Sequence, residues 1–329
     1  MANAGRVKPV IRGRMKFMTI RNTKLAFTVA IGAFFVQACA AQDASTDEKD
    51  RPELRVRQGD VRSSASSLAA NCTRQITIQD ELESANPGDV VCFQSSMKKS
   101  RLKITKGGTP DAPIVYSGEN ANVDGITIEA SNVIVQNYTL VKPNAPGIWA
   151  EGNNITLQNN TIVNPVNGDG DGIRFFGNDI KILHNTVRGT SNRYGHADCM
   201  QTYASDTPPS RNVLIEGNRC EKIDNMCLMA EGPNDGEGDG RGHSDHFTIR
   251  NNFCETLKAS QTLMFEDIQY ATITGNEFAG SPTKAIGLAI KSTFATVSGN
   301  IVSPDIDYEV GIDSSSKKGY QGPPPGGKP

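Results

Sequence analysis

The sequence predicts an all-β fold, a right-handed parallel β-helix of roughly eight coils behind an N-terminal cap. Three observations lead to this prediction. Gly occurs 32 times among 329 residues and charged residues make up only 21%, a composition that favours turn-rich β proteins. One short segment recurs about every 24 residues, which indicates stacked supersecondary units. Apolar and polar residues alternate inside that segment, which is the period of a β-strand.

Residues 1–41 have the features of a secretory signal peptide. Basic residues between Arg6 and Lys24 precede the apolar run LAFTVAIGAFFV, which is too short for a comfortable membrane span. We therefore expect an exported bacterial protein, either secreted or kept at the cell surface or in the periplasm. Residues 42–68 are polar and charged, as expected of a disordered linker.

The end of the signal allows two processing routes. Val36-Gln37-Ala38-Cys39 resembles the lipobox of bacterial lipoproteins, in which Cys39 becomes the lipidated first residue, with Gln37 in place of the usual small residue. Cleavage after Ala38-Cys39-Ala40 is the alternative. We expect membrane contact only through such a lipid.

The recurring segment has an alternating apolar stretch, then Asn or Gly in most copies, then Asn, one variable residue and one apolar residue or Cys. The copies are ITLQNNTI, IKILHNTV, VLIEGNRC, FTIRNNFC, ATITGNEF and ATVSGNIV. Steps of 25, 33, 34, 24 and 24 residues separate the shared Asn residues, which are Asn160, Asn185, Asn218, Asn252, Asn276 and Asn300. A second short strand precedes each copy, for example GIRFF at 172–176 and MCLMAE at 226–231. We therefore expect coils of two or three short strands over residues 69–305, followed by a flexible tail over 306–329.

The repeated Asn has a structural reason. Asn tolerates the left-handed backbone conformation, αL, better than most residues. Its amide can also hydrogen-bond to the Asn of the next coil and satisfy turn groups that would otherwise be buried without partners. The sequence therefore predicts an Asn ladder along one corner of the solenoid.

The segment before the repeats carries a family resemblance. ELESANPGDVV at 81–91, followed by GGTPDAPIVYSG at 107–118, resembles the N-terminal cap and first coil of the pectate-lyase-like superfamily. The resemblance continues through the repeats and implies a parallel β-helix of carbohydrate-active type. Because that superfamily includes lyases, hydrolases, epimerases and phage tail proteins, the residues must indicate the reaction.

Two coils are longer than the others, with insertions at 188–197 together with 205–211, and at 232–244. Insertions in a solenoid form loops on one face, often the binding face. Three of the four histidines lie in or beside these insertions: His196, His243 and His246. Asp198, two residues after His196, can orient the imidazole or join it as a metal ligand.

The leading functional hypothesis is a polysaccharide lyase that cleaves an acidic, uronic-acid-containing glycan by β-elimination. The reaction must neutralise the C6 carboxylate, remove the C5 proton with a base and protonate the leaving O4. Arg174 or a bound Ca²⁺ is the candidate for the first role, because an Arg fork suits a carboxylate. His196, Lys222 or Tyr203 is the candidate base, and Tyr203 or His243 the candidate acid.

Two other functions stay open. A glycoside hydrolase would use two carboxylates, chosen from Asp198, Asp224, Glu231 and Asp245. A non-catalytic surface β-helix would hold a glycan in the same turns without cutting it.

Two acidic runs, NGDGDG at 167–172 and DGEGDG at 235–240, resemble calcium loops because oxygen ligands alternate with Gly. Their candidate ligands are Asp169, Asp171, Asp235, Glu237 and Asp239. Ordinary turns are the alternative. No other cofactor is expected.

Six cysteines follow the signal, an even number in a compartment that permits disulfides. Cys220 and Cys254 share a template position in successive coils, and Cys199 and Cys227 share another. We therefore expect Cys199–Cys227 and Cys220–Cys254, with Cys72–Cys92 closing the cap. Reduced cysteines stacked in the core are the alternative.

The formal net charge of −2 provides no basic surface for nucleic acid. The expected partner is an acidic polysaccharide, and we expect a monomer.

Overall fold

The computed structural model describes residues 71–93, 100–119, 121, 123–204 and 207–329. The predicted signal (1–41), the linker (42–68) and the lipidation candidate Cys39 lie outside these residues. In the described part of the chain, no helix has the length and hydropathy needed to cross a membrane.

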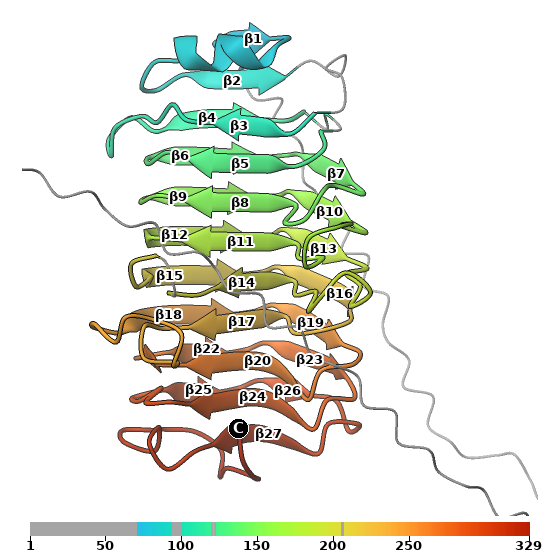
Figure 1. The fold of residues 1–329 in the computed structure, drawn as a ribbon, viewed down its shortest axis with the longest axis vertical. Helices are drawn as coiled ribbons and strands as arrows, with labels where there is room; N and C mark the ends of the chain where they lie inside the picture. Colours follow the sequence, from blue (N-terminus) through green and yellow to red (C-terminus); the bar gives the residue numbers. More distant parts are fainter. Residues whose placement is uncertain (1–70, 94–99, 120, 122, 205–206) are drawn as a thin grey trace, which may run out of the picture. The chain divides into compact units, whose positions relative to one another are not determined.

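The described residues form a parallel β-helix in which three parallel sheets run along the solenoid (Figure 1). The nine-stranded sheet consists of β3 (Leu102–Ile104), β5 (Ile126–Glu129), β8 (Ile148–Glu151), β11 (Ile173–Phe176), β14 (Met200–Thr202), β17 (Leu228–Glu231), β20 (Gln261–Glu266), β24 (Lys284–Ala289) and β27 (Tyr308–Ile312). The eleven-stranded sheet consists of β1 (Arg74–Ile76), β2 (Val90–Phe93), β4 (Ile114–Ser117), β6 (Val133–Gln136), β9 (Ile155–Gln158), β12 (Asn178–Leu183), β15 (Arg211–Glu216), β18 (Ser244–Arg250), β21 (Ile268–Gln269), β22 (Thr272–Thr274) and β25 (Thr296–Ser298). The seven-stranded sheet consists of β7 (Thr139–Val141), β10 (Thr161–Val163), β13 (Thr186–Arg188), β16 (Arg219–Ile223), β19 (Phe253–Thr256), β23 (Glu277–Gly280) and β26 (Ile301–Val302).

The core is a set of apolar columns inside the solenoid. In β11, Ile173 and Phe175 are buried while Arg174 between them points outward, as the alternation predicts. Residues at one position pair in register from coil to coil, and one fully buried column consists of Ile126, Ile148, Ile173, Met200, Leu228, Leu263 and Ile286. Burying each such side chain contributes about 1.5–3 kcal/mol, so the repeated apolar positions account for much of the stability.

The predicted Asn ladder is confirmed. The backbone N–H and the Nδ2 of Asn185 both donate to Oδ1 of Asn218, at 2.8 and 3.1 Å, and Nδ2 also donates to the carbonyl of Leu157 at 2.9 Å. The same pattern links every ladder residue from Asn160 to Asn300.

The expected αL backbone at the ladder Asn is wrong. The residue before each ladder Asn adopts αL instead, for example Asn159 and His184, both with φ of 53°. The ladder Asn is therefore required for its amide, and its neighbour makes the turn.

Asn218→Ala should lower the free energy of unfolding by roughly 3 kcal/mol, because it leaves the two donors of Asn185 and the carbonyl of Ile182 buried without partners. Denaturant titration measures the loss. Asn300→Ala is the control, because Asn300 ends the ladder where it is only partly buried and water can replace its amide. Equal losses in the two variants would contradict this account.

The first described coil carries the 3₁₀ helix η1 (Gln79–Ser84), whose Leu82 is fully buried. Cys72 and Cys92 form a disulfide with Cα atoms 5.7 Å apart. The predicted Cys72–Cys92 pair is confirmed.

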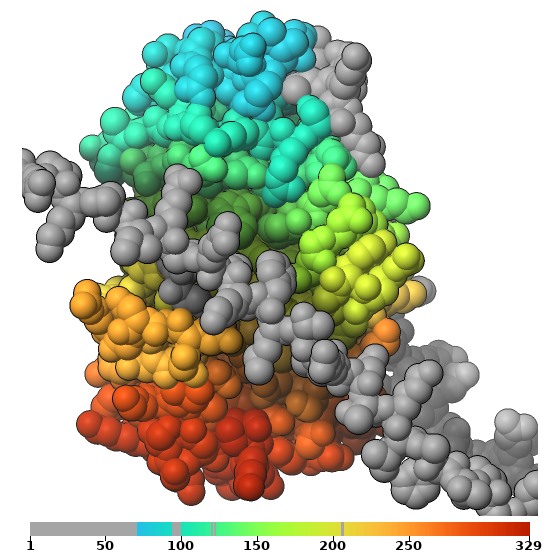
Figure 2. All heavy atoms as spheres, viewed as in Figure 1, coloured from blue at the N-terminus to red at the C-terminus, as the bar shows by residue number. Residues whose placement is uncertain are grey.

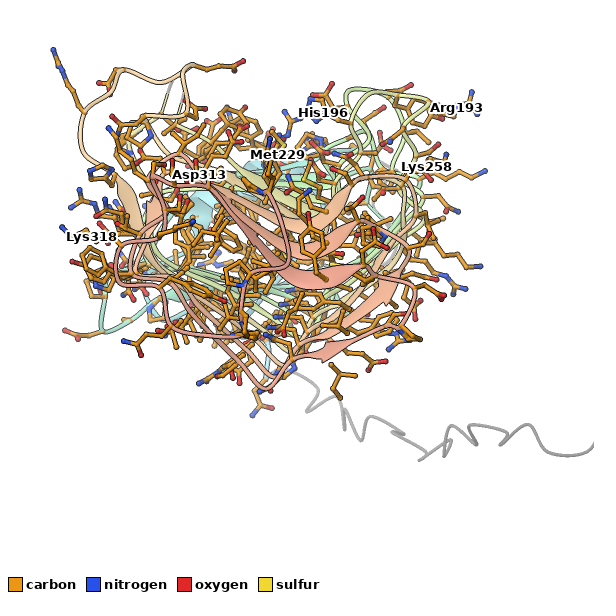
Figure 3. The ribbon with its side chains drawn as sticks, turned by 90° about the horizontal axis from the view of Figure 1, so that it is seen from below. Arg193, His196, Met229, Lys258, Asp313 and Lys318 are labelled. Atoms are coloured by element: carbon orange, nitrogen blue, oxygen red, sulfur yellow. A yellow bond between two sulfur atoms is a disulfide. The ribbon has the colours of Figure 1, made fainter. Side chains whose placement is uncertain are left out.

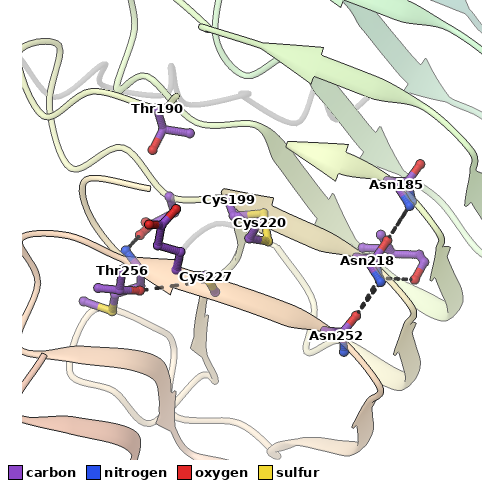
Figure 4. Close-up of a disulfide and its surroundings, with 12 residues drawn as sticks. Asn185, Thr190, Cys199, Asn218, Cys220, Cys227, Asn252 and Thr256 are labelled. Atoms are coloured by element: carbon purple, nitrogen blue, oxygen red, sulfur yellow. Dashed lines mark hydrogen bonds between the residues drawn. A yellow bond between two sulfur atoms is a disulfide. The ribbon is translucent and has the colours of Figure 1, made fainter. Parts of the chain in front are cut away.

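The other two predicted disulfides, Cys199–Cys227 and Cys220–Cys254, are wrong. Cys199 is bonded to Cys220, with Cα atoms 5.9 Å apart (Figure 4). Cys227 and Cys254 are free and buried. Residues stacked in register point in the same direction, so their sulfur atoms run side by side. Cys199 and Cys220 approach each other from two different sheets across the interior.

The expected flexible tail over 306–329 is also wrong. Residues 308–312 form β27, and the chain after it returns along the last coil, where Gly326 donates to the carbonyl of Val310 at 2.9 Å. The Tyr308 hydroxyl donates to the carbonyl of Lys328 at 2.9 Å. The Pro- and Gly-rich composition of the tail gives no sign of this return, because the hydrogen bonds that hold the tail are made to residues of the last coil.

Candidate functional site

Two long loops flank the outer face of the nine-stranded sheet. Loop 189–199 precedes β14, and loop 232–243 follows β17. In the view along the solenoid, His196 and Arg193 lie to one side of Met229, which is on the sheet (Figure 3). The two loops protrude in yellow-green and in orange in the space-filling view (Figure 2). We call the sheet surface between them the loop-flanked face.

Outward side chains on this face form two columns. The first column consists of Trp149, Arg174, Gln201, Met229 and Met264, which pair in register on β8, β11, β14, β17 and β20. The second column includes the register pairs Glu151 with Phe176 and Glu231 with Glu266. Tyr203 belongs to it as well, because it follows Thr202, which pairs with Ala230.

Arg174 is held by two carboxylates. Its Nε donates to Asp171 Oδ2 at 2.7 Å, and its Nη2 donates to Asp169 Oδ2 at 2.6 Å. Asp171 is fully buried, and burial raises its pKa while Arg174 opposes that rise. Among the described residues these bonds use Nε and Nη2, so Nη1 is the guanidinium nitrogen left for a ligand.

His196 lies above the fully buried Asp198. Asp198 Oδ1 accepts hydrogen bonds from Asn225 Nδ2 and from the backbone N–H of Met226, both at 2.8 Å. Its Oδ2 has no hydrogen-bond partner among the described residues, and His196 Nδ1 lies 3.8 Å from it, which is an ion-pair distance. The Asp198 carboxylate raises the pKa of His196 to about 9, and burial raises the pKa of Asp198 to about 6. At neutral pH the pair is therefore an imidazolium over a carboxylate.

Glu231 is a half-buried carboxylate on the same face. Burial raises its pKa to about 7, with further contributions from the negative charges of Asp235, Glu266 and Glu237. Burial and Asp235 also raise the pKa of Glu266. Near neutral pH, Glu231 is therefore partly ionised and able to accept a proton.

His243 lies at the opposite edge of the face from His196. Its Nδ1 contacts Oδ1 of the fully buried Asp267, whose Oδ2 accepts a hydrogen bond from Asn234 Nδ2 at 2.7 Å. With Nδ1 held by Asp267, the Nε2 atom of His243 is the one left for a ligand.

An aromatic row runs along the face beside Arg174. The rings of Trp149 and Phe176 are 4.7 Å apart between centroids, and those of Phe176 and Tyr203 are 4.8 Å apart. The Arg174 guanidinium lies 5.9 Å from the Tyr203 ring centroid. Phe176 itself is buried, so the partly exposed rings of Trp149 and Tyr203 are the apolar surface left for a sugar ring beside the charged groups.

The sequence matches no protein-family model, and no curated protein matches it significantly. Solved structures do match. A mannuronic acid specific polysaccharide family 6 lyase from human gut microbiota aligns with a TM-score of 0.50 and 14% identity, over 73% of this chain and 67% of that one. The PL6 family polysaccharide lyase Pedsa3628 from Pseudopedobacter saltans aligns with a TM-score of 0.49 and 14% identity, over 72% of this chain and 65% of that one. The PL6 family alginate lyase AlyGC aligns with 0.48 and 13%, over 72% of this chain, which spans only 40% of that one.

The fold is a right-handed parallel β-helix, which the chain shares with the gut-microbiota lyase. On this β-helix the loop-flanked face brings together six of the seven predicted catalytic residues: Arg174, His196, Asp198, Tyr203, Glu231 and His243.

Lys222 does not join them. It lies on β16 in the seven-stranded sheet, where its backbone N–H donates to Glu255 Oε2 at 2.8 Å. Lys222 is close in sequence to the lengthened coils, which suggested that it shares their face. At residue 222, however, the chain has left the nine-stranded sheet and runs in the seven-stranded sheet. The proposed catalytic role of Lys222 is therefore wrong for this site.

The acidic runs are engaged by the protein itself. Asp169 and Asp171 bind Arg174, while Asp235 Oδ1 accepts the backbone N–H groups of Glu237 and Gly238, both at 2.9 Å. Asp171 does lie with His196 and Asp198 in a group whose ligand atoms are within 4.8 Å of one another. A calcium site stays a prediction. At the first run, 167–172, the Arg174 guanidinium already provides the positive charge that binds Asp169 and Asp171.

Sequence reasoning missed Glu266 and Asp267. Both come from TLMFED, which occupies the same repeat position as MCLMAE. Aligning the two strands through their shared Leu-Met pair places Glu266 beside Glu231, as the register confirms, so this signal was available. Nothing in the sequence pairs Asp267 with His243, because β18, β19 and β20 lie between them in the chain and the contact forms only when the coils stack.

Proposed function

We propose that the chain is a polysaccharide lyase that cleaves an acidic, uronic-acid-containing glycan by β-elimination. The observation that carries the proposal is the charge arrangement of the loop-flanked face. Two cations, Arg174 on β11 and protonated His196 before β14, share this face with the partly ionised Glu231 on β17. The gut-microbiota enzyme with the same fold is a mannuronic acid specific lyase, and its substrate belongs to the proposed class.

Each step of the elimination has a candidate group. Arg174 Nη1 and the His196 imidazolium neutralise the C6 carboxylate, which increases the acidity of the C5 proton. Glu231 takes that proton, and the Tyr203 hydroxyl, next to it in the second column, donates to O4 as the bond to the leaving sugar breaks. His243, held by the buried Asp267, bounds the far edge of the face, where its Nε2 contacts the neighbouring sugar.

The roles set a pH window. Glu231 must be ionised, so activity rises as pH passes its pKa of about 7. His196 must be protonated, so activity falls as pH passes its pKa of about 9. We expect a maximum between these two values.

A panel of alginate, glucuronan, pectate and glycosaminoglycans tests the proposal. A lyase produces an unsaturated uronide that absorbs ultraviolet light, and Glu231→Gln should abolish this product. New reducing ends without that absorbance would reject the lyase. They would support a hydrolase, the second candidate, in which Glu231 and Glu266 act as acid and base from paired positions on adjacent strands.

We also propose an exported, monomeric protein, with Cys39 as the candidate residue for a lipid anchor. The basic and apolar N-terminal segment and the two disulfides support export. Fractionation of cells, with metabolic labelling of a Cys39→Ala variant, distinguishes a lipidated protein from a soluble one.

Asp235→Asn should move the acidic limb of the pH–activity profile to lower pH. The Asp235 charge is the largest electrostatic contribution that raises the pKa of Glu231, and Asn keeps the Oδ1 atom that accepts two backbone N–H groups. kcat/KM measured across pH provides the readout. Asp239→Asn, in the same loop, is the control, because Asp239 is not among the charges that act on Glu231; an equal shift in both variants would contradict the assignment.

A further inference from the structure

Four cysteines occupy the same two positions in consecutive coils. Cys220 and Cys254 pair in register on β16 and β19. Cys199 and Cys227 directly precede the paired residues Met200 and Leu228. Cys227 and Cys254 therefore stand one coil further along than Cys199 and Cys220, at equivalent positions.

Cys199 and Cys220 are joined in the structure, with Cα atoms 5.9 Å apart. This bond links the start of one coil, before β14, to its end in β16. Because coils of a parallel β-helix are related by a near-translation along the axis, the backbone at Cys227 and Cys254 has nearly the geometry that already holds a disulfide.

The sulfur atoms of the second pair are close together. The Sγ atoms of Cys220, Cys227 and Cys254 all lie within 4.8 Å of one another. Cys227 and Cys254 are buried, with exposed fractions of 1% and 3%. Small side-chain rotations therefore bring the two sulfurs into bonding distance without any backbone rearrangement.

We propose that Cys227 and Cys254 form a third disulfide in the mature protein, stacked on Cys199–Cys220. The two thiols lose two protons and two electrons as the S–S bond forms. A disulfide oxidant of the thiol–disulfide exchange type accepts both electrons and both protons and becomes a dithiol.

The order of events follows from burial. Burial raises the pKa of the Cys227 thiol well above its usual value, and the neighbouring Cys254 adds to the rise. A protonated, buried thiol is a poor nucleophile and is out of reach of an oxidant. The bond therefore forms while the coil is still open, and the folded protein then protects it.

The two bonds would close the two lengthened coils into covalent rings. Cys199–Cys220 encloses 205–211, and Cys227–Cys254 encloses loop 232–243. Closing a ring lowers the entropy of the unfolded chain, which offsets the entropy cost of the long loops. Loop 232–243 is one edge of the loop-flanked face, so the proposed bond would restrain that edge.

Peptide mapping of the full chain, purified without reductant, tests the proposal. Thiols are alkylated in denaturant, and trypsin then separates the four cysteines into peptides 194–211, 220–222, 223–241 and 251–258. The expected result is 223–241 linked to 251–258, and 194–211 linked to 220–222. Alkylated Cys227 and Cys254, or a link between 220–222 and 251–258, would overturn the proposal.

A stability measurement tests it independently. A reductant should lower the thermal midpoint of the wild type further than that of the Cys227→Ser, Cys254→Ser double variant, which has one disulfide fewer to lose. Equal drops would overturn the proposal. If the double variant does not fold, the peptide map of the wild type still decides.

Discussion

Glu231→Gln lowers kcat/KM for the cleaved glycan by roughly 10²- to 10⁴-fold, the usual contribution of a general base. The side chain is half-buried on the loop-flanked face, and burial together with the charges of Asp235 and Glu266 raises its pKa to about 7. Gln has almost the same shape but accepts no proton. Product absorbance under initial-rate conditions measures the loss.

The matched control is Glu151→Gln. Glu151 lies in the same outward column on β8, exposed to solvent and paired in register with Phe176. Its substitution should leave kcat/KM within about threefold of the wild type, since a surface carboxylate without partners contributes little. If both variants lost activity alike, the charge of the whole column would matter and Glu231 would not be the base.

His196→Gln lowers kcat/KM by roughly 10²-fold near neutral pH, comparable to the loss of one preorganised donor in an active site. It also removes the fall in activity near pH 9, because that limb reports loss of the His196 proton. Asp198 is left buried without its imidazolium. Since burial has already raised its pKa to about 6, it can take up a proton, and the fold should persist.

His246→Gln is the control for His196. His246 is also an exposed imidazole beside a carboxylate, with Nδ1 2.6 Å from Asp245 Oδ1. It lies on β18 in the eleven-stranded sheet and stacks on Tyr270, between β21 and β22, with ring centroids 5.0 Å apart. Retained activity in His246→Gln, with an unchanged alkaline limb, is expected. An alkaline limb that survives in His196→Gln would show that another group sets it.

Local patterns were enough to predict most of the fold. The alternation in each repeat predicted that Ile173 and Phe175 face inward and Arg174 outward, and the recurring Asn predicted the ladder. These features depend on a residue and its equivalent one coil away. In a solenoid, residues one repeat apart in the sequence are neighbours in space, so a repeat in the sequence is sufficient evidence for these contacts.

Predictions were wrong where they depended on the position at which the chain turns from one sheet to the next, or on a segment that folds back onto an earlier coil. Lys222 was assigned to the site although it lies on another sheet, and the cysteines were paired along the stack although Cys199 bonds across the interior to Cys220. Which sheet a residue lies on depends on where each coil bends. The bends are set by αL residues and packing that a linear pattern does not encode.

The sequence by itself determined that this chain is a stack of β coils whose irregular part lies between Asn185 and Asn252, because periodic burial and a repeated Asn amide leave few other ways to satisfy the backbone. Only the tertiary structure decided which groups share the loop-flanked face and what charge they carry. Burial of Asp198 and Glu231, the approach of His196, and the engagement of Arg174 by Asp169 and Asp171 are long-range effects. Ionisation depends on desolvation and on neighbouring charges, and both exist only once the coils are stacked.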